Sequence, residues 1–543
     1  MPQFQPFEKV LILALDSVCW ELLLPLVNSG VMPALGAFLN KAHYGILEST
    51  LPPHTAPAWT TFLTGQDPGR HGVLNFVHYD PIGHKFQFND SSAQREMNFL
   101  TRLTNQGTTC GSIFLPRSYP PYPLKGGYIV SGFETPNTDV RFTEPEELRD
   151  EVLDVSPGLH FNFEEDWADD RSEKGFEGNI DRAIAAIDLL ERLAIHFQRE
   201  RPTDLQVAYL QATDILFHKA WKWCDPATSS ASPTRRDQVH KFFRRVDQML
   251  GRVFCLHTDS RTSQRFKPGV DERTLRVLVS DHGHGPSRGR IYMNNLLRDW
   301  GFLKPLGHLR NMSHRIKLLT MNAATRRARS RELLLDWSRT KAYLAHAAIY
   351  GFVYVNLKGR EPEGSVAPEQ YESVRQELID KFLSEKIPGT TEPLFTKVYK
   401  GEEVFARKQE LNLPDLVVVP ADGFFPRQKL TSSAPVKPAP NSPGGVHRTD
   451  GVYAMQGTGI TPSQGLSARA NIADIAPTIL AAMGASIPSS MSGRPMLHLF
   501  SDPPQIRIDV ESASPEHPQT SPVYNQEEQQ AVEKRLADLG YLE

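Results

Sequence analysis

Three aspartate and histidine residues follow apolar runs of this 543-residue chain at positions suited to metal binding. Asp16 ends the run Val10–Leu15, and Asp281 and His282 follow the run Leu275–Val279 within the segment VSDHGHGP. Carboxylates and imidazoles are ligands of zinc and manganese. A lone aspartate such as Asp16 is more often the N-cap of a helix than a metal ligand, so the residue alone does not establish a metal site.

A second pair of candidate ligands lies in the segment LQATDILFHKAW. Asp214 and His218 are four residues apart, which places both on one face of a helix. Such a pair is more often an ordinary surface pair than a metal site. His447, in the loop segment GGVHRTDG, is by itself typical of an unspecialised loop histidine, and His284 is more typical of an exposed or outer residue than of a ligand.

A threonine precedes a predicted helix in the segment LPPHTAPAWTTFLTG. Thr55 lies at the start of that helix, where backbone N–H groups and the helix dipole favour a bound phosphate. The alternative is that Thr55 only caps the helix. For this residue taken alone, the capping interpretation is the simpler one.

Taken together, these motifs resemble the alkaline phosphatase superfamily. Along the chain, the motifs are an Asp after the first predicted strand, a T-x-P-x-W turn, D-x-x-x-H, S-D-H-G and a G-x-H near the carboxyl end. More narrowly, the chain resembles the type I phosphodiesterase/nucleotide pyrophosphatase family, in its bacterial and archaeal phosphohydrolase or phosphomutase branch. The stretch PPHTAPAWTTFLTGQDPGRHGV is the most specific signal, and the terminal VEKRLADLGYLE also fits. The resemblance covers nearly the whole chain and is weakest at 140–200 and 501–523.

The resemblance implies a site with two divalent metal ions, zinc in the first place and manganese as the alternative. Asp214, His218 and His447 resemble the ligands of one ion. Asp16, Asp281 and His282 resemble those of the other ion, with Thr55 bound to it as the nucleophile. The implied activity is hydrolysis of phosphoric monoesters or diesters through a phosphothreonine intermediate. The alternatives are a phosphomutase of the same superfamily and a non-catalytic binding member.

The sequence departs from related patterns in two ways. Nucleotide pyrophosphatases carry an Asn three positions after the nucleophile, where this chain has Ala58, which argues against nucleotide pyrophosphatase activity proper. A backbone N–H after Thr55 or the side chain of Asn75 would have to replace that donor. Sulfatases place Cys or Ser, and then Arg, at the positions of Thr55 and Trp59, so a sulfatase is not indicated.

The elements that must position these residues predict an α/β fold. The continuous apolar run Val10–Leu15 is typical of a strand buried on both faces. The segments LQVAYL (Leu205–Leu210) and LRVLV (Leu275–Val279) are interpreted as two more strands of this type, and helical patterns lie between the strands. This alternation indicates a doubly wound, mostly parallel sheet with helices on both faces. The resemblance makes the expected fold alkaline-phosphatase-like.

The span of the candidate site determines the expected domains. Its residues run from Asp16 to His447, so one sheet must gather them, and residues 1–500 are predicted to form a single catalytic domain. An α+β lobe at 300–412 is predicted to interrupt it, after which 414–419 returns to the main sheet. Residues 501–543 are predicted to be a linker and an amphipathic helix at Glu527–Leu539.

Composition restricts the partners. Lys+Arg is 60 and Asp+Glu is 63, a net charge of −3, which excludes a polycationic nucleic-acid binder. The arginine-rich stretch 310–331 is interpreted as a solvated helix face.

The apolar run near the N-terminus is too short for a signal peptide or membrane span, so we expect a cytoplasmic protein that acts on a small phosphoester. The terminal helix is expected to pack on the body or on an identical subunit.

Overall fold

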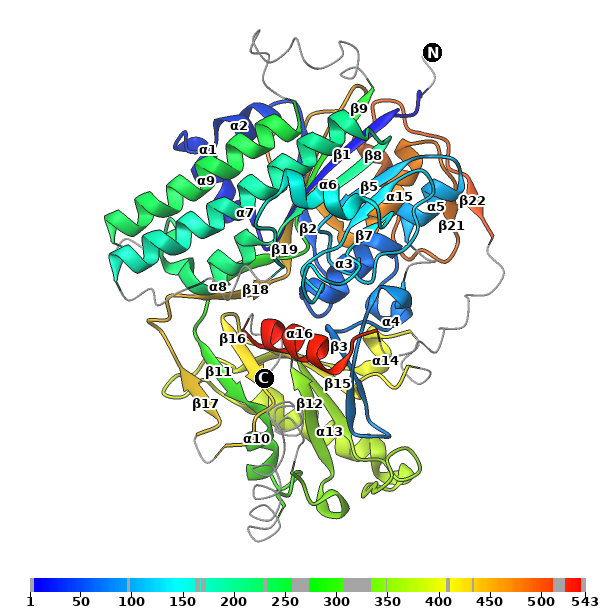
Figure 1. The fold of residues 1–543 in the computed structure, drawn as a ribbon. Helices are drawn as coiled ribbons and strands as arrows, with labels where there is room; N and C mark the ends of the chain where they lie inside the picture. The colour runs from blue at the N-terminus through cyan, green and yellow to red at the C-terminus, as the bar shows by residue number, and fades with distance from the viewer. Residues whose placement is uncertain are drawn as a thin grey trace. The chain divides into compact units, whose positions relative to one another are not determined.

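The computed structural model describes residues 4–94, 98–161, 167, 172–227, 232–255, 273–306, 334–347, 349–406, 411–431, 434–510 and 523–538 (Figure 1). The chain forms two compact units. Unit 1 comprises Met1–Asp67, Asp90–His284 and Pro443–Leu539, and unit 2 comprises Pro68–Asn89, Gly285–Ser442 and Gly540–Glu543. The arginine-rich stretch 310–331 lies outside the described residues.

Unit 1 is built on a nine-stranded sheet with the order β20-β2-β19-β9-β1-β8-β5-β6-β7. Five pairs of neighbouring strands are parallel: β2–β20, β9–β1, β1–β8, β8–β5 and β5–β6. The other three pairs, β2–β19, β19–β9 and β6–β7, are antiparallel. This confirms the predicted α/β class with a mostly parallel sheet. The strands are β1 (Lys9–Leu15), β2 (His43–Glu48), β5 (Cys110–Ile113), β6 (Tyr128–Val130), β7 (Thr143–Glu144), β8 (Leu205–Leu210), β9 (Thr274–Val279), β19 (Asp450–Gln456) and β20 (Ser467–Asn471).

The helices of unit 1 form two groups. One group, in which each helix contacts another, contains α1, α2, α6, α7, α8 and α9, and the second contains α3, α5 and α15. Helices α7 and α9 lie side by side in Figure 1. The bounds are α1 (Trp20–Asn28), α2 (Pro33–Leu39), α3 (Thr55–Thr64), α5 (Phe99–Asn105), α6 (Leu148–Val155), α7 (Glu173–Glu200), α8 (Ala212–Cys224), α9 (Pro233–Val253), α15 (Ile475–Ala482) and α16 (Gln526–Asp538). Within the described residues, no single helix is long and apolar enough to cross a membrane; only α1 and α2 together, bent by 107°, meet that length and composition.

Two short strand pairs complete unit 1. Strand β10 (Gly283–Pro286) pairs with β18 (Gly445–Arg448), and β21 (Ile487–Pro488) pairs with β22 (Ile508–Asp509). The second segment of unit 1 ends within β10, at His284. The first pair matters for the site because β10 carries His284 and β18 carries His447.

Unit 2 has its own sheets. Four antiparallel strands have the order β12-β13-β15-β14, three have the order β16-β11-β17, and β3 and β4 form a hairpin. The bounds are α4 (Pro68–His71), β3 (Val77–Asp80), β4 (Lys85–Phe88), β11 (Gly289–Tyr292), α10 (Met293–Asp299), β12 (Ala342–Ala347), β13 (Gly351–Val355), α13 (Tyr371–Ser384), β14 (Phe395–Lys400), α14 (Gly401–Val404), β15 (Leu416–Pro420), β16 (Phe424–Arg427) and β17 (Val436–Pro438).

The predicted return of residues 414–419 to the main sheet is wrong. Strand β15 pairs with β13 and β14 inside unit 2. An apolar run shows that a strand is buried but does not show which sheet it joins, since a central strand of either sheet has the same composition. Unit 2 therefore continues to Ser442 and also contains 68–89, beyond the limits 300–412 predicted for the lobe.

A buried guanidinium group connects the C-terminal helix α16 to another segment of unit 1. Arg535, 4% exposed, donates to the carbonyl oxygens of Phe133, Thr135 and Pro136. We expect Arg535→Ala to lower the free energy of unfolding by about 2–4 kcal/mol, because charged hydrogen bonds contribute about 1.5–3 kcal/mol each and the carbonyls are left buried. Urea denaturation measures this. Gln526→Ala removes an exposed side chain of the same helix and is the control, for which no change is expected.

Candidate metal and nucleophile site

The carboxyl ends of three adjacent parallel strands meet at one edge of the main sheet. Strand β1 lies between β8 and β9, with Leu15 opposite Leu210 and Ala14 opposite Val279. Ligand sites of open α/β sheets lie at such an edge. Asp16 follows β1, Asp214 lies in the first turn of α8 after β8, and Asp281 and His282 follow β9. The structure thus brings together residues far apart in the sequence.

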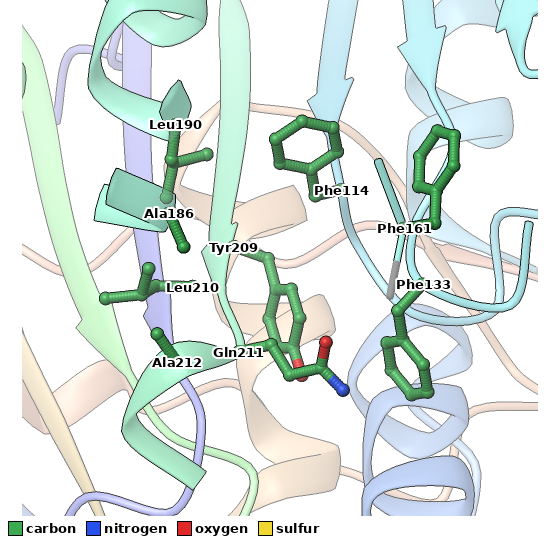
Figure 2. Close-up of a pocket in the computed structure, with 9 residues that line it drawn as sticks. All are labelled: Phe114, Phe133, Phe161, Ala186, Leu190, Tyr209, Leu210, Gln211 and Ala212. Atoms are coloured by element: carbon green, nitrogen blue, oxygen red, sulfur yellow. The ribbon is translucent and has the colours of Figure 1, made fainter. Parts of the chain in front are cut away.

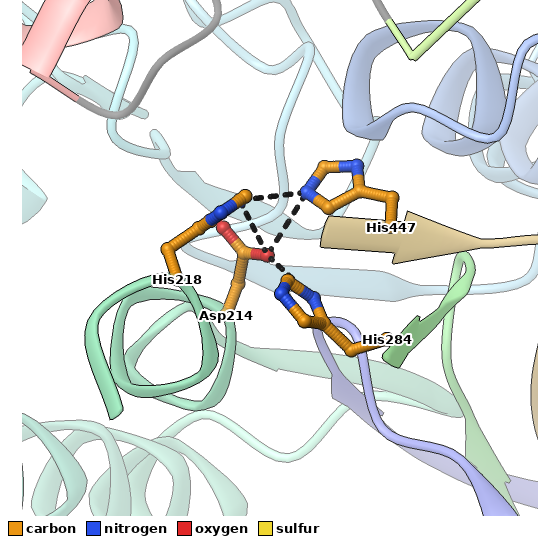
Figure 3. A group of neighbouring side chains, drawn as sticks. All are labelled: Asp214, His218, His284 and His447. Carbon is orange, nitrogen blue, oxygen red and sulfur yellow. Dashed lines mark hydrogen bonds and ion pairs between the residues drawn. The ribbon is translucent and has the colours of Figure 1, made fainter. Parts of the chain in front are cut away.

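Four of the side chains form a group that we call the histidine cluster: Asp214, His218, His284 and His447 (Figure 3). Asp214 Oδ1 is 3.2 Å from His447 Nε2, 3.4 Å from His218 Nε2 and 3.8 Å from His284 Nδ1. The Nε2 atoms of His218 and His447 are 2.8 Å apart. One carboxylate oxygen therefore faces three imidazoles, an arrangement that matches the ligand types of zinc.

His284 is a member of this cluster although the sequence favoured an exposed or outer position. Its side chain is 1% exposed. The residue is two positions after His282 in an extended segment, and residues two apart in extended chain point to the same side. The H-x-H spacing was the signal that could have identified it.

The second group, which we call the carboxylate cluster, contains Asp16, Asp281 and His282. All three are fully buried, and His282 Nε2 is 3.2 Å from Asp281 Oδ2 and 3.7 Å from Asp16 Oδ1. Thr55, the first residue of α3, is also fully buried, and its Oγ1 is 3.3 Å from His282 Nε2. The structure thus places the predicted nucleophile beside this cluster.

Backbone carbonyls orient two of the imidazoles. His447 Nδ1 is 3.2 Å from the carbonyl oxygen of Pro53, and His282 Nδ1 is 3.2 Å from that of Gly283. A carbonyl can only accept, so in each contact Nδ1 carries the proton and Nε2 presents a lone pair. In both residues it is Nε2 that faces the clusters, as a metal ligand requires.

Burial dominates the electrostatics of the site. It raises the pKa of Asp16 well above its usual value, and the negative charges of Asp281 and Asp214 add to this; burial also raises the pKa of Asp281 to about 7. Burial opposes ionisation of Asp214 too, but the imidazoles of His218 and His447 hold its pKa well below the usual value. Burial lowers the pKa of His218 to about 4 and those of His282 and His284 well below 6.5. The imidazoles of His218, His282 and His284 are therefore neutral and able to bind a metal.

The donor sets fit divalent cations. Asp16 Oδ1 and Asp281 Oδ2 are buried and accept no hydrogen bond from the part of the chain that the structure describes. Buried carboxylates without a partner are costly unless a cation neutralises them. Oxygen and neutral nitrogen donors without thiolate suit zinc or manganese.

Tyr209 contacts the carboxylate cluster through its hydroxyl group. Its hydroxyl donates to Asp16 Oδ2, while its ring lines a cavity of about 20 Å³ together with Phe114, Phe133 and Leu190 (Figure 2). Ligand pockets measure about 300–1,000 Å³, so this cavity is too small for a substrate group. The apolar wall instead holds the ring, and the ring aims the hydroxyl at Asp16.

We expect Tyr209→Phe to weaken binding of one zinc or manganese ion by about 10- to 100-fold, the usual effect of losing a hydrogen bond to a ligand. The ring packing against Trp59, at 5.4 Å between centroids, is kept. Competition with a chromophoric chelator measures the affinity. Tyr122→Phe is the matched control, because that buried hydroxyl contacts Asn98 rather than a cluster residue. Equal affinities in the two variants would show that the Tyr209 hydroxyl does not support the cluster.

The two candidate replacements for the donor missing at Ala58 differ in position. Asn75 belongs to unit 2, and its Oδ1 accepts a hydrogen bond from Phe76 N. Ala56 is the second residue of α3, where backbone N–H groups have no acceptor within the helix. Pro57 has no N–H, so within unit 1 the first turn of α3 offers the N–H groups of Thr55 and Ala56.

Comparison with known proteins identifies the family and the fold of this chain. A family model described as type I phosphodiesterase/nucleotide pyrophosphatase matches residues 10–450. No protein with a curated function matches the sequence. Among solved structures, phosphonoacetate hydrolase from Sinorhizobium meliloti 1021 is similar, with a TM-score of 0.55, 14% identity and coverage of 89% of this chain and 100% of that one. Human ectonucleotide pyrophosphatase/phosphodiesterase 5 has a TM-score of 0.50, 14% identity and coverage of 91% and 100%. At this identity the two structures show the shared fold.

Proposed function

From the premise that this chain belongs to the type I phosphodiesterase/nucleotide pyrophosphatase family, we propose that it cleaves small phosphoric esters through a phosphothreonine at Thr55. Membership of the family makes the chain a phosphoester hydrolase; the covalent route and the metal ions are the proposal. The observation that carries it is the position of Thr55 Oγ1, buried at the start of α3 and 3.3 Å from His282 Nε2.

We propose the residues of the two clusters as the metal ligands. The histidine cluster would hold one divalent cation and the carboxylate cluster the other, and when bound they supply positive charge to phosphoryl oxygens and lower the pKa of a coordinated hydroxyl. Zinc is the first candidate, and manganese is the alternative. The N–H groups of Thr55 and Ala56 in α3 face the N-terminal end of the helix, where an anion is stabilised.

The reaction has two displacements. Thr55 Oγ1 forms a bond to phosphorus as the bond from phosphorus to the ester oxygen breaks, and the alcohol leaves with a proton while Thr55 loses its own. Water then attacks the phosphothreonine, the bond to Oγ1 breaks, and Thr55 recovers its proton as phosphate, or a phosphomonoester from a diester, is released. The carboxylate cluster is closed to bulk water, because the side chains of Asp16, Asp281 and His282 are fully buried.

A substrate panel tests this proposal. The purified chain, stripped with a chelator and reloaded with zinc or manganese, is offered p-nitrophenyl phosphate, bis-p-nitrophenyl phosphate, a nucleotide pyrophosphate and phosphonoacetate. Metal-dependent release of product from the ester substrates is the expected result. Phosphate transfer to an added alcohol in place of water would identify the phosphomutase alternative. Fewer than two bound ions per chain together with no turnover would favour a non-catalytic member.

A further inference from the structure

Ser17 lies between the two clusters in a backbone conformation that serine rarely adopts. It directly follows Asp16 and is fully buried, and its φ is +67°. This is the left-handed region, which glycine enters without steric penalty and other residues enter rarely. A residue with a Cβ at this turn therefore indicates that its side chain has a use.

The side chain and backbone of Ser17 contact members of both clusters. Its hydroxyl donates to Asp214 Oδ1 at 2.5 Å, within the histidine cluster. Its backbone N–H donates to Asp281 Oδ1 at 3.2 Å, within the carboxylate cluster. Its Oγ also lies 3.2 Å from His282 Nδ1 and 3.3 Å from His284 Nδ1. One residue thus connects an oxygen of each cluster.

The direction of these hydrogen bonds follows from proton counting. A hydroxyl has one proton, and an ionised carboxylate can only accept, so the proton of Ser17 lies toward Asp214. The lone pairs of Oγ then accept from Nδ1–H of His282 or His284. With Nδ1 of His282 protonated, its Nε2 presents a lone pair beside Thr55 Oγ1, at 3.3 Å.

We propose that Ser17 is a positioning residue that couples the two metal clusters, orienting Asp214 in one and the imidazole of His282 in the other. The proposal rests on the proposed function, because it assigns Ser17 a role toward the two cations. Loss of the hydroxyl would leave Asp214 with one hydrogen bond fewer and would remove one of the two oxygens that face His282 Nδ1, the other being the carbonyl of Gly283. Binding of both ions would then weaken although no ligand is removed.

Two substitutions separate this role from a structural one. Ser17→Gly removes the hydroxyl and also relieves the left-handed backbone, so the metal-free protein should be at least as stable as the wild type. Its metal affinity should nevertheless fall by about 10- to 100-fold. In steady-state kinetics, the fold-change in kcat should exceed the fold-change in KM. Ser17→Ala removes the hydroxyl and keeps the Cβ, and should lose the same affinity without the gain in stability. Asn412→Gly, at another position of positive φ in unit 2, controls for the glycine effect alone.

The measurements are urea denaturation of the metal-free proteins, metal content and chelator competition, and steady-state kinetics with p-nitrophenyl phosphate. A Ser17→Gly protein with wild-type metal affinity and kcat would overturn the role of Ser17 while leaving the proposed function intact. A metal-free Ser17→Gly protein less stable than the wild type would also overturn it, because the serine would then be structural. A wild-type chain that binds neither ion would overturn the proposed function itself, and with it this role.

Discussion

Replacement of Thr55 by alanine is expected to reduce the rate of phosphoester cleavage by more than about 10³-fold, as loss of a nucleophile does in covalent enzymes. The reason is geometric. Thr55 Oγ1 lies at the N-terminus of α3 beside His282 Nε2, and the whole side chain is buried. The substitution removes the atom that would bond to phosphorus but changes neither cluster. Metal content should therefore stay close to that of the wild type while kcat collapses.

Two variants make the Thr55 experiment decisive. Thr55→Ser keeps the hydroxyl and should retain measurable turnover. Thr60→Ala removes a buried hydroxyl from the same helix, one that donates to the carbonyl of Ala56, and should leave kcat near the wild-type value. Acid quench with labelled substrate, followed by mass measurement, detects phosphate on Thr55. An unchanged rate in Thr55→Ala would remove Thr55 from the mechanism and leave a direct attack by water as the remaining route.

The sequence predicted the central strands well because they are buried on both faces. The run Leu205–Leu210 is β8 to the residue, and Val10–Leu15 and Leu275–Val279 differ from β1 and β9 by one residue each. In a parallel sheet covered by helices, nearly every position of a central strand is apolar, with exceptions here at Gln206 and Arg276, so the limits of the strand are visible in the composition. The polar residues that follow such runs then identify the edge of the sheet that carries the site.

Features that depend on tertiary pairing were not predictable in the same way. The short strands β5 and β6 lie in a segment rich in tyrosine, proline and glycine, which indicates loop rather than strand. The role that we propose for Ser17 depends on a positive φ, which a serine in the sequence does not indicate. The cytoplasmic location, self-association through the last helix and the assignment of each ligand to an ion stay predictions.

Asp214→Asn is expected to have the second-largest effect, a loss of one bound ion and a fall in kcat of more than about 10²-fold, since ligand loss exceeds the 10- to 100-fold effect of outer contacts. Asp214 Oδ1 faces His218, His284 and His447 and accepts the hydrogen bond of Ser17. The amide has nearly the same shape but no charge. Its NH₂ group, turned toward the imidazoles, would compete with a cation for their lone pairs.

The stoichiometry in this variant discriminates between one shared site and two separate ones. The carboxylate cluster keeps all three of its side chains in Asp214→Asn, so metal analysis should find one ion per chain where the wild type has two. Asp188→Asn is the matched control, because that carboxylate pairs with Arg245 between α7 and α9, away from the clusters. If Asp214→Asn lost both ions, the two clusters would bind cooperatively. Two structural routes for that coupling are the Ser17 contacts to Asp214 and Asp281 and the stacked rings of His282 and His447, whose centroids are 3.8 Å apart. If it kept both, Asp214 would not be a ligand, and the three imidazoles alone would have to hold the ion.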